Sequence, residues 1–194
     1  MIKNSILLIS LIFILNGCLT KELPSYNTYT LQLKENTTSL EGFSKSIKVT
    51  EPKTIQSLNN SAIHYIKGAL SKNQYALSKW SDKPSKMIQE LITSKLSESG
   101  VSFVTSSNIK TKTDYILQSE LVNFEQVFID ESSYAILKIR VYLTDTTDDS
   151  ISFKTFEYKE KCEENNALGA VKSLNTVSNT LANDIQLWMD KVIK

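Results

Sequence analysis

A period-two alternation of side chains runs through residues 134–143. The odd positions are all aliphatic: Ala135, Leu137, Ile139, Val141 and Leu143. The even positions include Lys138, Arg140 and Tyr142. Because successive side chains of a strand point to opposite faces, this segment predicts a sheet strand with one buried face and one exposed face. A sheet with one apolar face needs a second layer of structure to cover that face.

Two segments with helical spacing of apolar residues can supply the covering layer. The first lies between Pro84 and Gly100, which suit the start and the end of a helix. Its apolar stripe consists of Met87, Ile88, Leu91, Ile92 and Leu96. The second covers residues 165–193, and its stripe consists of Leu168, Val171, Leu174, Val177, Leu181, Ile185, Trp188 and Val192. Either Ser81 or Asp82 can cap the first helix, and both stripes read as core rather than as ligand grooves.

Extended segments precede and separate the two helices. We expect strands within residues 26–33, 46–50, 62–67, 74–80, 101–105, 114–128, 134–143 and 151–159. This order predicts an α+β fold in which a mixed or antiparallel sheet carries two long helices on one face. A length of 194 residues suits one such domain, which we place at residues 26–194.

The N-terminus carries an export signal. A lysine precedes an apolar stretch over residues 6–15, which is too short to cross a membrane as a helix because a span needs roughly 20 residues. The stretch ends in Leu15-Asn16-Gly17-Cys18, which matches the bacterial lipobox. We predict a signal peptide over residues 1–17, a lipidated Cys18 and a short tether over residues 18–25. The alternative is an ordinary secretory signal that contains a chance cysteine.

The composition excludes several classes of function. The 22 basic residues are nearly balanced by 21 acidic residues, and the basic residues form no continuous run. We therefore expect no binding to nucleic acid. One histidine and two cysteines leave no zinc-ligand set, and we predict neither a metal nor a cofactor. Once Cys18 carries lipid, Cys162 has no partner within the chain, and the glutamates beside it disfavour the thiolate.

The remaining candidates for chemistry are isolated. His64 has no second histidine or cysteine near it in sequence, and no nucleophile elbow accompanies it, although a catalytic His64 stays an alternative. Asp145, Asp148 and Asp149 lack the glycine and distal glutamate of a calcium-binding EF-hand and predict a polar hairpin turn. We therefore expect that the protein is not an enzyme.

Several short motifs occur in an order that resembles a known family. They are Tyr29-Thr30-Leu31, the segment from Tyr75 through Trp80 to Pro84, Ser99-Gly100-Val101, Asp114-Tyr115-Ile116-Leu117, Asn123-Phe124-Glu125 and Leu143-Thr144-Asp145. Together with the lipobox they resemble the auxiliary lipoproteins of ABC-type transporters, the family of the paraquat-inducible lipoprotein. The resemblance extends over roughly residues 18–190, although Lys79 and Ser81 depart from the residues common in that family.

The resemblance implies a non-catalytic lipoprotein that works with a mammalian-cell-entry-domain protein and its ABC permease and ATPase. Its cargo would be phospholipid or other hydrophobic solutes, and a homo-oligomer is compatible with it. Leu19, rather than aspartate, follows Cys18, which favours a periplasm-facing anchor in the outer rather than the inner membrane. The alternative is an envelope lipoprotein that binds or activates a cell-wall synthesis or envelope-assembly partner.

The outward stripe of the alternating strand is the candidate partner surface. Its residues are Tyr134, Lys138, Arg140 and Tyr142. Tyrosine and arginine are enriched among the residues that dominate binding energy at interfaces. The alternative for this stripe is an ordinary solvated sheet face.

Overall fold

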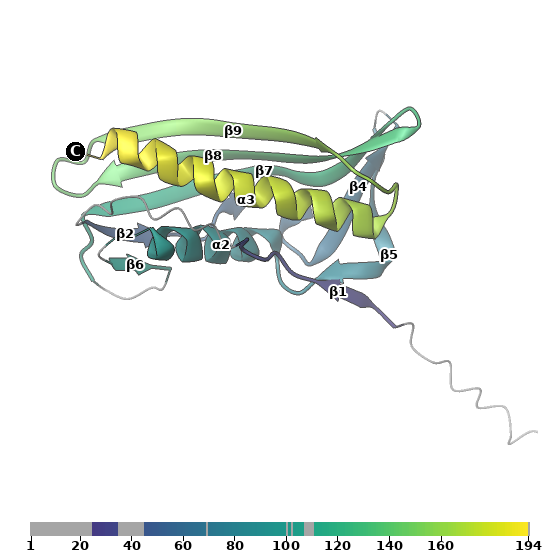
Figure 1. The fold of residues 1–194 in the computed structure, drawn as a ribbon, viewed down its shortest axis with the longest axis horizontal. Coiled ribbons are helices and arrows are strands. Elements are labelled where there is room, and N and C mark those ends of the chain that lie inside the picture. The colour runs from purple at the N-terminus through teal and green to yellow at the C-terminus, as the bar shows by residue number, and fades with distance from the viewer. Residues whose placement is uncertain are drawn as a thin grey trace, which may run out of the picture.

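The computed structural model describes residues 25–34, 45–68, 70–99, 101, 103–106 and 111–193. Within these residues the chain forms nine strands, one 3-10 turn and two α-helices (Figure 1). In chain order they are β1 (Asn27–Tyr29), β2 (Ser46–Val49), β3 (Lys53–Thr54), η1 (Gln56–Leu58), β4 (Ala62–Lys67), β5 (Lys72–Trp80), α2 (Pro84–Glu98), β6 (Phe103–Thr105), β7 (Tyr115–Ile129), β8 (Ser132–Asp145), β9 (Ile151–Lys161) and α3 (Ala167–Val192).

Strand β7 organises the sheet. On one side it pairs with β8, which pairs with β9, and both pairings are antiparallel. On its other side β2, β3 and β4 pair with it one after another, all in parallel. Strand β6 extends the sheet beside β2, while β5 and then β1 extend it beside β4. The sheet is therefore mixed, with three long antiparallel strands and a row of short strands beside them.

Both helices cover the same face of this sheet, as Figure 1 shows. The odd-numbered side chains of β8 point into the interface and are buried, as the alternation predicted. On α3, Leu174, Leu181 and Ile185 have no exposed surface. Burying each such aliphatic side chain stabilises the fold by about 1.5–3 kcal/mol. The predicted α+β fold, with two helices on one face, is confirmed.

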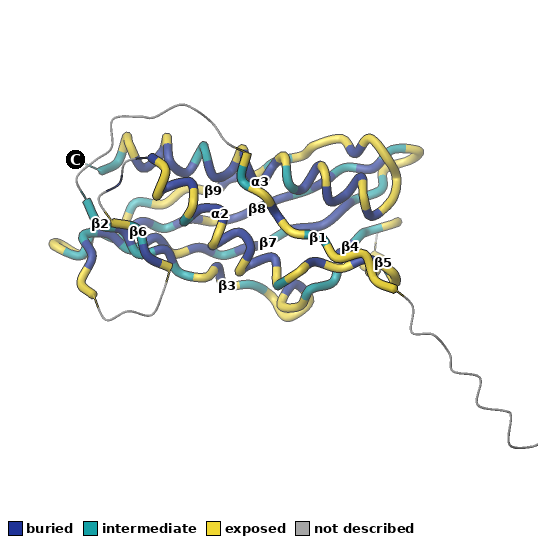
Figure 2. The backbone as a smooth tube through the Cα atoms, turned by 60° about the horizontal axis from the view of Figure 1, so that its bottom comes forward, coloured by how far each residue is buried: buried dark blue, intermediate teal, exposed yellow. Residues whose placement is uncertain are grey.

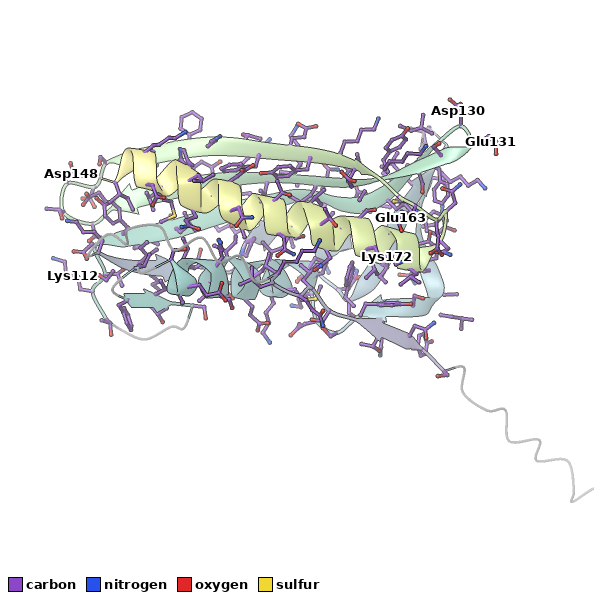
Figure 3. The ribbon with its side chains drawn as sticks, in the orientation of Figure 1. Lys112, Asp130, Glu131, Asp148, Glu163 and Lys172 are labelled. Atoms are coloured by element: carbon purple, nitrogen blue, oxygen red, sulfur yellow. The ribbon has the colours of Figure 1, made fainter. Side chains whose placement is uncertain are left out.

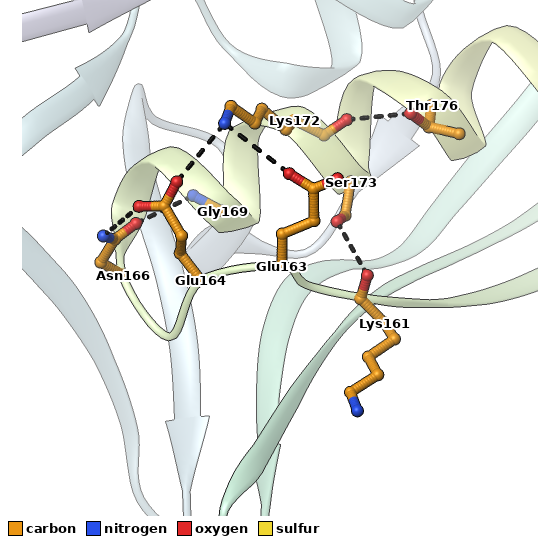
Figure 4. A network of polar contacts seen from close by, with 8 residues as sticks. All are labelled: Lys161, Glu163, Glu164, Asn166, Gly169, Lys172, Ser173 and Thr176. Carbon is orange, nitrogen blue, oxygen red and sulfur yellow. Dashed lines mark hydrogen bonds and ion pairs between the residues drawn. The ribbon is translucent and has the colours of Figure 1, made fainter.

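A network of polar contacts fixes the start of α3 (Figure 4). The Asn166 side chain caps the helix by accepting a hydrogen bond from the Gly169 N–H at 2.9 Å. Lys172 forms ion pairs with Glu163 and Glu164 in the segment before the helix. A Cβ atom on Gly169 would clash with the backbone carbonyl of Glu164, so the close approach of this segment requires glycine.

The first predicted strand is shorter than expected. Only Asn27–Tyr29 pairs with a neighbouring strand, although the apolar pattern suggested an extended segment up to residue 33. Side chains of α3 replace the missing partner strand: the N–H groups of Gln32 and Lys34 donate to Asn175 Oδ1 at 2.8 Å and Asn179 Oδ1 at 2.7 Å. The chain after β1 therefore lies against the helix layer instead of continuing in the sheet.

Two other details differ from the predicted helices. The N-cap of α2 is Lys83, not Ser81 or Asp82, and its side chain makes no capping hydrogen bond. Asp82 instead accepts a hydrogen bond from the Lys83 N–H at 2.8 Å and forms an ion pair with Lys86. Leu168, predicted on the buried stripe of α3, is 39% exposed, whereas Ala167 and Ala170 in the same turn of the helix are buried.

Candidate functional site

The sheet face that carries no helix is the candidate partner surface, and we call it the open face. Tyr134, Lys138, Arg140 and Tyr142 all lie on it, since each alternates with a buried residue of β8. The structure thus brings the four predicted residues together along one strand. Figure 2 shows buried residues on the long strands β7 and β8 and exposed residues along β9 at the edge of the sheet.

Charged side chains in the middle of the open face form cross-strand pairs. Lys138 Nζ lies 2.7 Å from Glu157 Oε2 on β9, and Arg140 Nη1 lies 3.2 Å from Glu120 Oε2 on β7. The ammonium of Lys159 lies 4.2 Å from the centre of the Tyr134 ring. Exposed pairs of this kind contribute about 0–1 kcal/mol each, so they leave the face balanced in charge without adding much stability.

One end of the open face is apolar. In the β8–β9 register Phe153 lies opposite Tyr142, and Ile151 lies opposite Thr144. Phe153 is 74% exposed and Ile151 is 62% exposed. The sequence analysis missed both residues, although they occupy alternate positions of the predicted strand over residues 151–159. Together with Tyr142 they add an apolar strip to the predicted stripe.

A shallow hollow of about 230 Å³ adjoins the other side of Tyr142. It is lined by Thr50, Glu51, Lys53, Gln118, Ser119, Glu120 and Tyr142. Tyr142 therefore lies between this hollow and the apolar strip of Ile151 and Phe153. An aromatic side chain in such surroundings offers both contact area and a hydrogen-bonding hydroxyl to a partner.

His64 is placed for a structural role. It is largely buried, and its Nε2 lies 3.3 Å from Oδ1 of Asn60, an amide rather than a nucleophile. Burial, together with the positive charge of Lys72, lowers the pKa of His64 below its usual value. Beside it the buried carboxylate of Glu125 pairs with Lys72 at 2.9 Å and accepts a hydrogen bond from Asn123 at 2.6 Å.

The other isolated candidates also have structural partners. Asp145 and Asp148 accept hydrogen bonds from the backbone N–H groups of Thr147 and Ser150, which forms the predicted hairpin turn between β8 and β9. Cys162 is a buried free thiol in the core. In the part of the chain that the structure describes, no group of three histidine, cysteine, aspartate or glutamate residues is arranged to hold a metal ion.

A buried polar chain that the sequence analysis missed connects the sheet to α3. The Tyr75 hydroxyl donates to Gln126 Oε1, the Gln126 amide donates to Ser133 Oγ at 2.8 Å, and Ser133 donates to Asn165 Oδ1 at 2.7 Å. Burial and the neighbouring Tyr65 raise the pKa of Tyr75 to about 12, so its hydroxyl stays protonated. Because each buried polar atom has a partner, this chain supports the fold.

The chain enters the domain at one end of its long axis. Cys18, the predicted lipidation site, lies outside the described residues, and the first described residue, Ser25, leads directly into β1. In Figure 1 this entry point lies at the same end of the molecule as β4 and β5. Among the residues that the structure describes, no helix is both long enough and apolar enough to span a membrane.

The fold resembles solved structures from other proteins. One is protein XCC0632 from Xanthomonas campestris, assigned to the DUF330 family: it is 14% identical, with a TM-score of 0.74 over 84% of this chain and 94% of that one. Another, an uncharacterized protein, is 13% identical, with a TM-score of 0.67 over 83% of this chain and 96% of that one. At these identities the likeness concerns the fold. No significant match was found among curated proteins.

A family model gives the relationship directly. The model described as "ABC-type transport auxiliary lipoprotein component" matches residues 29–186, which is most of the chain and nearly the whole described domain. The match includes β7, β8, β9, α2 and the greater part of α3. The resemblance seen in the sequence motifs is therefore confirmed, and the chain belongs to the family of ABC-type transport auxiliary lipoproteins.

Proposed function

We propose that this chain is a lipid-anchored, non-catalytic subunit of an ABC-type transporter that also contains a mammalian-cell-entry-domain protein, a permease and an ATPase. The cargo is phospholipid or another hydrophobic solute that crosses the periplasm. The family match over residues 29–186 is the observation that carries this proposal. The lipobox at Cys18 supports the anchor, and Leu19 after it favours the outer membrane, with the domain facing the periplasm.

In this proposal the open face binds the transport partner. The predicted stripe, Tyr134, Lys138, Arg140 and Tyr142, and the adjacent strip of Ile151 and Phe153 form the contact surface. Phe153 and Ile151 are mostly exposed on the edge strand, so a partner can bury them without disturbing the core. The apolar and aromatic side chains at one end of this face and the paired charges in its middle are the two kinds of contact that specific protein interfaces combine.

The proposal is tested by purifying the full-length lipidated protein from its native membrane and identifying what accompanies it. We expect a mammalian-cell-entry-domain protein together with permease and ATPase subunits. Phe153→Asp should abolish this recovery, whereas Leu187→Asp, at an exposed apolar residue of α3, should not. Recovery of a cell-wall synthesis enzyme without transporter subunits would contradict the transport role and support the alternative partner class.

The anchor is tested separately by metabolic labelling with palmitate. Cys18→Ser should remove the label, because the cysteine sulfur and the amino group freed by cleavage carry the acyl chains. Cys162→Ser, at the buried cysteine, is the matched control and should keep the label. A labelled Cys18→Ser protein would show that the lipid is attached elsewhere.

A further inference from the structure

The hairpin between β4 and β5 carries an unusual apolar side chain at its tip. Leu70 is 100% exposed, and Gly68 before it adopts a left-handed φ of 79°, which turns the chain. Lys67 and Lys72 flank the tip. Because Lys67 pairs with Phe128 in the β4–β7 register, the tip lies beside the end of β7, where Ile129 is 42% exposed. Two exposed apolar side chains thus lie at the tips of neighbouring hairpins.

A cluster of aromatic rings supports this end of the domain. The ring centres of Tyr65 and Tyr75 are 4.8 Å apart, and those of Tyr65 and Phe128 are 5.8 Å apart. The ammonium of Lys67 lies 5.7 Å from the centre of the Phe128 ring. Aromatic rings beside lysines are typical of side chains at a membrane–water interface, where the ring meets the apolar layer and the ammonium stays in water.

The chain from the predicted anchor enters at this same end. Tyr26, which is 52% exposed, lines a hollow together with Gln74 and Tyr75 of β5. The ammonium of Lys79 lies 5.3 Å from the centre of the Tyr26 ring. Strand β1 runs parallel to β5 and pairs with its last three residues, Ser78–Trp80, so the chain enters this end of the domain beside the part of β5 that is farther from the hairpin. Figures 1 and 2 both show β1 beside β5 at this end of the domain.

The length of the tether limits which part of the domain can reach the bilayer. The six residues between Cys18 and Ser25, the first described residue, make seven Cα–Cα steps that can extend over at most about 25 Å. The 26 residues of α3 extend over about 39 Å along the long axis of the domain. The opposite end, marked by Asp148 in Figure 3, is therefore farther from the entry point than the tether is long. The anchor holds the end that contains Leu70 near the lipid.

The charges at this end nearly cancel. Lys72 is paired with the buried Glu125 at 2.9 Å. Lys67 and Lys79 are the other basic residues of β4 and β5. Asp130 and Glu131, in the turn between β7 and β8 that Figure 3 labels, supply two acidic side chains at this end. A surface without net charge gains little from anionic lipid, so its contact with a bilayer would depend on apolar side chains.

From the exposed leucine, the ring cluster and the short tether, we infer that the β4–β5 hairpin tip is a membrane-contact site, in which Leu70 inserts into the interface of the bilayer that holds the anchor. The occupant is the surface of a zwitterionic bilayer, with no requirement for anionic lipid. The inference rests on the proposed lipidation of Cys18.

The test uses the full-length lipidated protein in phosphatidylethanolamine–phosphatidylcholine vesicles. A nitroxide is attached at Leu70→Cys and, as the matched control, at Phe153→Cys on the opposite end of the domain. Cys162 is buried and Cys18 carries lipid, so the introduced cysteine takes the label. Collision of each nitroxide with a water-soluble nickel chelate and with oxygen, which concentrates in lipid, is measured by electron paramagnetic resonance.

We expect nickel accessibility at position 70 to be several-fold lower than at position 153, with oxygen accessibility higher. The same result is expected when phosphatidylglycerol is added. Equal accessibility at the two positions on protein that floats with the vesicles would overturn the membrane contact, as would protection that appears only with anionic lipid. Protein that does not float with the vesicles would instead overturn the proposed anchor, and the contact with it.

Discussion

The two faces of strand β8 differ although they are made by alternate residues of one segment. Toward the helices, Leu137 and Ile139 have no exposed surface. On the open face, Lys138 and Arg140 form exposed ion pairs with neighbouring strands. The covered face therefore holds the fold together, whereas the open face can change its side chains at little cost in stability. The protein can in this way keep one sheet face for folding and leave the other free to vary.

The largest contrast is expected between adjacent residues of β8. Leu137→Ala should lower the free energy of unfolding by about 2–5 kcal/mol, because it leaves a cavity beneath the helices. Lys138→Ala, one residue away on the open face, should change it by less than about 1 kcal/mol. Urea unfolding followed by circular dichroism measures both variants. Similar losses for the two would mean that the faces do not differ as described.

The attachment of α3 to the sheet gives the next largest effect. Gly169→Ala should cost about 1–3 kcal/mol, because its Cβ would meet the backbone carbonyl of Glu164 and force the helix start to shift. Lys172→Ala, which removes two exposed ion pairs of the same network, should change the free energy of unfolding by no more than about 0.5 kcal/mol. Unfolding curves of the two variants compare the tight backbone approach with the surface charges. A neutral Gly169→Ala would contradict the close contact.

Acid should lower the stability of the folded protein through His64, which lies beside the buried Glu125. The pKa of His64 is lowered from its usual 6.5, so the folded state favours the neutral ring. As pH falls, His64 takes up a proton in the unfolded chain before it does so in the folded protein. The stability contributed by neutral His64 is therefore present above pH 6.5 and lost below it. The melting temperature of the native protein should fall between about pH 7.5 and about pH 5.5, and His64→Gln should reduce that fall. An unchanged pH dependence in His64→Gln would assign the effect to other groups.

The smallest effect is expected from the ion pair between Arg140 and Glu120. Its coupling energy, obtained from Arg140→Ala, Glu120→Ala and the double variant, should be about 0.2–1 kcal/mol and should decrease in high salt. A coupling well above this range would show that the pair is a structural element of the sheet rather than part of a replaceable surface.

Local patterns were sufficient to predict much of the fold. The alternation in β8, the two apolar stripes and the polar turn between β8 and β9 each depend on residues close in sequence, and the structure contains all of them. The four residues of the predicted stripe lie on the open face for the same reason, because side-chain direction in a strand follows from parity.

The rest depends on contacts between distant residues. Nothing in the amino-acid sequences of β2, β3 and β4 indicates that these strands pair one after another with successive parts of β7. The strand-like pattern after Tyr29 is overridden by Asn175 and Asn179, which lie more than a hundred positions away. The position of Phe153 beside Tyr142 depends on the register between β8 and β9.

The central proposal is that the open face, and not the helix layer, binds the transport partner. The most direct measurement places a photo-crosslinking amino acid at Tyr142 on the open face or at Leu187 on the exposed side of α3, in the full-length protein in its native membrane. The proposal predicts a crosslink to the mammalian-cell-entry-domain protein from position 142 and none from position 187. A crosslink from position 187 with none from position 142 would contradict it.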